Sequence, residues 1–380
     1  MTAPAGAAGP AAAHGAPPGP VVLAANQPAD RFYAGGARIA EFRGPDGAPA
    51  AGDHVPEDWV GSATTLFGED ALGLTRLPGG GTLADAVAAD PVAWLGPDRA
   101  AAHGSDVGLL VKLLDAGERL PVHAHPDVSF AARHLGLAHG KTEAWVALTA
   151  APVHLGFRRD VGADELRRWV DEQDTAAVLD AMHVLHLAPG DAVLVPAGLP
   201  HAIGAGAFVV ELQEPTDLSI LVEWAGFAID GAVAGHLGLG FGTALAAVDR
   251  RGWRASEVEA LRGARAGDVG DLLPGAAPFF RVERWRGAGE WDAGFAVAVV
   301  VAGAGALVGR DGARTPLRRG STVLVPWSAG PLRLEPRPGR PLELLRCRPP
   351  AEAPGAQDPG RTEVSAGSRA AGAGAPVSRR

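Results

Sequence analysis

Apolar and polar positions alternate along much of the chain in short runs that end at glycine, proline or aspartate. Such runs predict β-strands joined by tight turns. A turn with the sequence APGD interrupts one of these runs. The expected strands cover Gly108–Leu114, Val184–Val195, Phe208–Gln213 and Ser219–Trp224.

The region 279–348 repeats this pattern at regular spacing and predicts a second β unit, of the small barrel or sandwich kind. Its longest apolar run, Phe295–Val308, is interrupted by Gly303 and Gly305. That run is too short to span a bilayer, so we interpret it as buried strand.

Helical periodicity is clearest over residues 164–182, where acidic residues crowd the start. The apolar residues before and after Asp174 fall on opposite sides of a straight helix, which predicts two short helices with a break there. A short helix is expected at Thr82–Ala89 with Thr82 as its cap, and a further helical stretch at Gly240–Arg265.

Composition divides the 380 residues into five segments. Residues 1–20 and 349–380 are rich in Ala, Gly and Pro and are expected to be disordered tails. Between them we predict a first barrel with a helical insertion, a helical linker and a second, degenerate barrel. Their expected ranges are 21–225, 226–278 and 279–348.

The net charge of −9 argues against a nucleic-acid partner, since such proteins usually present a basic face. The single cysteine, Cys347, cannot form an internal disulfide, and no basic region precedes an apolar core at the N-terminus. We therefore expect a cytoplasmic protein, monomeric or homodimeric, without membrane association.

Lysine is rare. Of 34 basic residues only Lys112 and Lys141 are lysines, and both lie beside a cluster of histidines. Arginine cannot replace lysine where a compact charge or the loss of a proton is required. Chance could place two lysines together, but a functional role is the interpretation we favour, above all for Lys141.

His123 and His125 are two residues apart, so on a strand their imidazoles point to one face and could share a metal ion. Glu143 could supply a carboxylate from a return strand. His201 follows a rigid turn containing Pro196 that would fix its orientation. Each residue taken alone could equally be a structural or surface residue.

Together these residues resemble the two motifs of the cupin superfamily. Gly190, Pro196, Gly198, His201 and Gly204 match its second motif, and His123, His125 and Glu143 match its first. The segments LLVKLL, LPVHAHPD, GKTEAW, VPAGLPHAI and VELQEPTD narrow the resemblance to type I phosphomannose isomerases.

The resemblance implies a mainly β fold of two cupin-type jelly-roll barrels with an accessory helical segment. It implies one Zn²⁺ held by His123, His125, Glu143 and His201. It also implies a phosphorylated sugar as partner, mannose 6-phosphate interconverting with fructose 6-phosphate by proton transfer between C1 and C2. Lys141 and Glu211 are then the catalytic candidates, and Lys112 is expected to bind substrate.

The sequence departs from that family at three positions. His123 stands where the family has Gln, and Pro121 where it has a small hydroxyl residue. Leu221 stands where it has an active-site arginine, a role that Arg133, Arg158 or Arg159 could take over. Two alternatives therefore stay open: a cupin oxygenase using iron or manganese, and a sugar-binding cupin that has lost activity.

Overall fold

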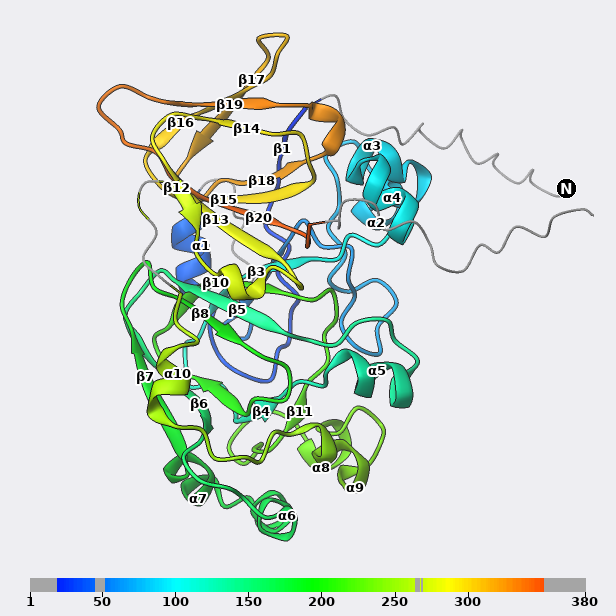
Figure 1. Cartoon of the computed structure of the whole chain (residues 1–380), viewed down its shortest axis with the longest axis vertical. Coiled ribbons are helices and arrows are strands. Elements are labelled where there is room, and N and C mark those ends of the chain that lie inside the picture. The colour runs from blue at the N-terminus through cyan, green and yellow to red at the C-terminus, as the bar shows by residue number, and fades with distance from the viewer. Residues whose placement is uncertain (1–18, 45–51, 264–266, 268, 352–380) are drawn as a thin grey trace, which may run out of the picture.

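Four antiparallel β-sheets lie one upon another in the computed structural model, which describes residues 19–44, 52–263, 267 and 269–351 (Figure 1). The predicted tails fall almost wholly outside these residues. The sheets form two sandwiches, so the mainly β prediction with two β units is confirmed. Within the described residues the strand orders do not close into rings.

The first sandwich consists of two five-stranded sheets whose inner faces share one apolar cluster. One sheet has the order β2 (Glu57–Val60), β3 (Leu110–Asp115), β10 (Phe208–Gln213), β5 (Glu143–Ala147), β8 (Ala192–Val195). The other has the order β11 (Ile220–Leu221), β4 (His123–Ala124), β9 (His201–Ile203), β6 (Ala151–Phe157), β7 (Met182–Leu187).

The second sandwich pairs a six-stranded with a four-stranded sheet. The larger has the order β1 (Val21–Val22), β18 (Thr322–Val325), β15 (Ala296–Ala302), β20 (Glu343–Arg348), β13 (Arg281–Arg286), β12 (Val269–Asp271). The smaller has the order β14 (Gly289–Trp291), β19 (Leu332–Pro336), β16 (Ala304–Val308), β17 (Arg314–Arg318). Strands β1 and β12 thus join this sandwich from outside the range 279–348.

The two sandwiches pack back to back through the largest apolar cluster. Val111 and Leu113 of β3 meet side chains such as Val297 of β15 and Leu345 of β20 there. The two middle sheets are therefore buried on both faces, and every residue of β3 is buried. Burial on both faces explains why such strands read as continuous apolar runs.

Helices cover the edges and the outer face of the β4–β9 sheet, and within the described ranges they are all short. Their bounds are α1 (Ala37–Arg43), α2 (Leu83–Ala89), α3 (Pro91–Leu95), α4 (Pro97–His103), α5 (Val128–Leu135), α6 (Ala163–Glu172), α7 (Thr175–Asp180), α8 (Gly231–Ala234), α9 (Phe241–Ala244) and α10 (Ala255–Glu259). Short 3₁₀ turns lie at η2 (Leu245–Ala247), η3 (Pro274–Ala276) and η4 (Trp327–Ala329).

Two helix predictions are confirmed, and in each the structure shows the residues that start or stop the helix. Thr82 caps α2 in a capping box with Asp85. The break between α6 and α7 falls at Gln173, whose φ of 51° is left-handed, and Asp174, whose carboxylate accepts from the Ala177 amide and caps α7. Each helix can then turn its own apolar side toward the sheet.

The predictions for Gly240–Arg265 and Ser219–Trp224 were wrong in extent. Among the described residues of the first, only α9, η2 and α10 are helical. The chain between η2 and α10 docks in extended form instead, and the Trp253 amide donates to the Phe157 carbonyl over 2.7 Å. In the second, only Ile220 and Leu221 form a strand. In its described part, the predicted linker 226–278 is mostly loop. No helix within the described residues is long and apolar enough to cross a bilayer.

A buried ion pair joins the two sandwiches. Arg43 of α1 lies 3.1 Å (Nε) from Oδ2 of Asp58 in β2, and both side chains are almost completely excluded from solvent. The same guanidinium donates to the hydroxyl of Thr322 in β18 and, over 3.0 Å, to the Leu23 carbonyl. One side chain thereby connects the first sandwich to the second.

Replacing Arg43→Met is expected to lower the free energy of unfolding by about 3–5 kcal/mol, because Asp58 is left buried without a counter-charge. The double variant Arg43→Met with Asp58→Asn should recover a large part of that loss. Urea unfolding measures both, and Arg159→Gln at an exposed ion pair serves as the control. Equal stability of Arg43→Met and the parent would contradict this role.

Candidate metal centre

Three histidines converge inside one end of the first sandwich. His123 of β4 lies directly opposite His201 of β9 in the antiparallel ladder, so both side chains point to the same face. His125 is two residues further along the chain. The ring centroids are 4.2 Å apart for His123 and His201, and 4.9 and 4.8 Å from each of these to His125.

Main-chain carbonyls orient all three rings. The Nδ1 of His123, His125 and His201 lies 2.8, 2.6 and 2.8 Å from the carbonyls of Pro121, Leu218 and Leu199 respectively. A carbonyl oxygen can only accept, so each Nδ1 carries the proton and donates it. The Nε2 of each ring is therefore the nitrogen that faces away from the anchoring carbonyl.

Glu143 completes the group from the facing sheet. Its Oε2 lies 3.0 Å from His125 Nε2 and its Oε1 lies 3.3 Å from His201 Nε2. The Lys141 ammonium contacts Oε2 of this carboxylate and donates to His125 Nε2 over 2.8 Å. Glu143 lies on the return strand that the sequence predicts, as the first residue of β5, and its side chain is buried.

The charge states suit a cation ligand set. Burial lowers the pKa of His123 well below its usual value, and burial together with the nearby Lys141 ammonium lowers that of His125 to about 3. Burial alone would raise the pKa of Glu143, but Lys141 and His125 outweigh it and hold that pKa well below its usual value. At neutral pH His123 and His125 are therefore neutral imidazoles and Glu143 is a carboxylate.

This donor set fits a divalent metal ion. The ligand nitrogens of the three histidines all lie within 4.8 Å of one another. His201 Nε2 is buried without a hydrogen-bond partner among the described residues, an arrangement that normally costs free energy. A second hydrogen bond from each ligating imidazole to the protein is typical of metal sites.

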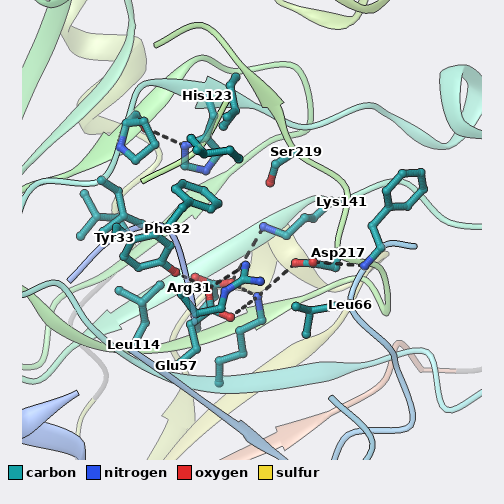
Figure 2. Close-up of a pocket in the computed structure, with 18 of the residues that line it drawn as sticks. Arg31, Phe32, Tyr33, Glu57, Leu66, Leu114, His123, Lys141, Asp217 and Ser219 are labelled. Carbon is teal, nitrogen blue, oxygen red and sulfur yellow. Dashed lines mark hydrogen bonds and ion pairs between the residues drawn. The ribbon is translucent and has the colours of Figure 1, made fainter. Parts of the chain in front are cut away.

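A cavity of about 240 Å³ adjoins this group (Figure 2). His123, the half-buried member of the three, reaches its wall, together with Lys141, Glu143 and Glu211. Figure 2 shows Arg31, Glu57 and Asp217 gathered on the side of the cavity opposite His123. The cavity therefore has the histidine group at one end and a cluster of charges at the other.

Lys112 lies inside that charge cluster. Its ammonium is 3.6 Å from Glu57, 3.5 Å from Glu211 and 3.9 Å from Asp217. Burial alone would lower its pKa, but these carboxylates raise it above the usual value and keep the side chain charged. Lys112 and Glu211 are direct cross-strand partners on β3 and β10.

The environment of Glu211 favours the neutral form of its side chain. Burial and the neighbouring Glu143 carboxylate raise the pKa of Glu211, against the pull of Lys112 and Lys141. Its Oε1 lies 3.9 Å from the Lys141 ammonium. The structure thus brings every predicted site residue to one end of the sandwich, with Glu211 as the most basic buried carboxylate in the cavity wall.

Sequence reasoning missed the segment that closes the cavity at Arg31, Phe32 and Tyr33. The segment is fixed by the main chain: the Arg31 amide donates to the His54 carbonyl over 3.0 Å. At Gly35, φ is +155° and a Cβ would lie 1.9 Å from the Asp115 carbonyl, so only glycine fits. The position of Arg31 shortly before the Gly35–Gly36 pair was the available signal.

The candidates for the missing arginine lie elsewhere. Arg158 and Arg159 pair with Asp180 and Glu165 on the outer surface, and Arg133 is exposed on α5. Leu221, by contrast, does line the cavity and lies opposite His123 in the β4–β11 ladder.

No family model matches the chain. Among curated proteins it is 36% identical over 117 residues to mannose-6-phosphate isomerase of Streptococcus mutans, and 32% identical over 117 residues to mannose-6-phosphate isomerase ManA of Bacillus subtilis. The match spans 30% of this chain and 35% and 36% of those relatives, which is about a third of their length.

Solved structures share the fold over most of the chain. The mannose 6-phosphate isomerase of Bacillus subtilis superposes with a TM-score of 0.63 at 20% identity, covering 87% of this chain and 99% of its own. A mutant phosphomannose isomerase from Salmonella typhimurium gives 0.65 at 16% identity, covering 87% and 100%. A mannose 6-phosphate isomerase bound with zinc and yttrium gives 0.63 at 17%, covering 88% and 99%. The prediction that the chain has the fold of phosphomannose isomerases is thereby confirmed.

Purified chain is expected to bind one equivalent of a divalent transition metal at pH 7, and metal removal should lower its melting temperature because the ion binds only the folded state. His125→Ala and His201→Ala should each abolish stoichiometric binding. His134→Ala, at an exposed position on α5, is the matched control. Elemental analysis with calorimetry measures the stoichiometry, and full binding by His201→Ala would refute the ligand set.

Proposed function

We propose that this chain is a zinc-dependent aldose–ketose isomerase that interconverts mannose 6-phosphate and fructose 6-phosphate. The observation that carries the proposal is the convergence of three Nδ1-anchored histidines and Glu143 at the end of a cavity with a buried acid–base pair. The sequence similarity to mannose-6-phosphate isomerases supports it, as does the shared fold. A cytoplasmic location fits a phosphorylated sugar as substrate.

The proposed ligands are His123, His125, Glu143 and His201. The ion, when bound, would polarise the sugar oxygens at C1 and C2 and stabilise the negative charge that develops there. Zinc accepts a set of imidazoles and one carboxylate in four-coordinate sites. Lys141 would have to release His125 Nε2 and Glu143 on loading, which leaves its ammonium free to face the cavity.

Glu211 is the residue we propose to take the proton from one carbon and return it to the other. Its raised pKa makes its carboxylate a stronger base than an ordinary glutamate. Lys141 is the proposed donor to the sugar oxygens, since its ammonium lies within reach of both Glu143 and Glu211. Lys112 would hold Glu211 in place from the other side.

Zinc-loaded protein is expected to convert mannose 6-phosphate to fructose 6-phosphate in a coupled assay, without consuming oxygen. Turnover should disappear on chelation and return when zinc is added. Oxygen consumption that requires iron would instead indicate an oxygenase. Sugar binding without turnover would indicate a cupin that has lost activity.

Glu211→Gln is expected to lower kcat by about 100-fold or more, the size of a general-base contribution. In the parent enzyme the carboxylate form is lost as pH falls through the raised pKa of Glu211. The decline of kcat toward acid pH should therefore have its midpoint above the ordinary glutamate pKa of about 4.3. The pH profile of the residual activity in Glu211→Gln should lack that limb. An unchanged acid limb would exclude Glu211 as the base.

A further inference from the structure

We propose that Arg31 is the residue that binds the phosphate group of the sugar. It would supply the positive charge that is missing because this chain has Leu221 at the position of the family arginine. This inference deepens the proposed isomerase function and rests on it for the identity of the sugar. It concerns a residue that no motif of the sequence pointed to. The argument follows from which positive charge in the cavity is available to an anion.

The Arg31 guanidinium is under-satisfied. Its Nε is buried without a hydrogen-bond partner among the described residues. Its nearest carboxylate contact, from NH2 to Glu57 Oε1, is 3.6 Å, an ion pair longer than a hydrogen bond. Glu57 is already occupied, since it accepts from the Tyr33 hydroxyl and, over 2.6 Å, from the Trp59 indole.

The two lysines in the cavity wall are not available in the same way. Lys112 is surrounded by Glu57, Glu211 and Asp217, and only 3% of its side chain is exposed. Lys141 is held by the metal-ligand group, with 5% of its side chain exposed. Arg31 exposes 14% of its side chain, lines the cavity and forms its ion pair with Glu57, while Tyr33 and Asp217 also act on its charge.

Position and chemistry agree with a phosphate ligand. Arg31 lies across the cavity from His123, so a sugar whose reacting carbons face the histidine group would extend its far end toward Arg31 (Figure 2). A guanidinium offers a planar pair of donors that matches phosphate oxygens, and it stays charged when buried. Leu221 cannot contribute, because it is an apolar part of the wall beside His123.

The test compares Arg31→Gln and Arg31→Lys with the control Arg159→Gln, all zinc-loaded. Binding of inorganic phosphate and of mannose 6-phosphate is measured by calorimetry, and turnover is measured on mannose 6-phosphate and on unphosphorylated mannose. Arg31→Gln should weaken phosphate binding and raise KM for mannose 6-phosphate about tenfold or more. The preference for the phosphorylated sugar, as the ratio of kcat/KM values, should fall by a similar factor.

Arg31→Lys keeps a charge beside Glu57 but loses the paired donors, so it should bind phosphate more weakly than the parent and more tightly than Arg31→Gln. It also covers the case in which Arg31→Gln fails to fold. Arg159→Gln should match the parent throughout.

The outcomes separate this inference from the proposed function. Parent-like phosphate binding in both Arg31 variants would overturn the Arg31 assignment, even if isomerase activity is present. Loss of phosphate binding in those variants would support it, even if no isomerase turnover is found in any protein. No phosphate binding by the parent, together with turnover of unphosphorylated mannose, would overturn it in favour of a neutral sugar substrate.

Discussion

The three hydrogen bonds from histidine Nδ1 atoms to main-chain carbonyls are the constraint on which the rest of the site depends. They fix the tautomer and the direction of each ring, so that three Nε2 lone pairs meet at one point. The carbonyls belong to turns that adjoin the strands, notably the one after Pro196 that ends at His201. A substitution in those turns would therefore reorient a histidine ring away from the metal position, although the histidine itself is unchanged.

The rest of the site consists of buried side chains of opposite charge that lie close together. Lys112, Lys141 and Arg31 oppose Glu57, Glu143, Glu211 and Asp217 within one cavity wall, so the cluster carries a net negative charge. A divalent ion would reverse that sign and allow an anionic sugar to enter. The balance also bears on why Lys112 and Lys141 are lysines: each compact ammonium contacts carboxylates in the buried interior, and a wider planar guanidinium would not make equivalent contacts.

Much of the fold and the grouping of the proposed ligands at one place could be predicted because the signals were local. Strand alternation, the Thr82 cap and the break at Asp174 depend on neighbouring residues, and the two cupin motifs carry their spacing in sequence. Arg31 could not be found this way, since its role depends on a loop that returns to the cavity from far outside the motifs. The stretch 240–265 misled because docking of Trp253 against β6 overrode its helical pattern.

The central claim, a divalent ion held by His123, His125, Glu143 and His201, is tested most directly by anomalous X-ray diffraction at the zinc edge. Crystals of zinc-loaded protein should show one strong peak about 2.0–2.2 Å from three Nε2 atoms and a Glu143 oxygen, the usual zinc distances. The Lys141 ammonium should have left His125. A peak elsewhere, or none at this position, would contradict the account.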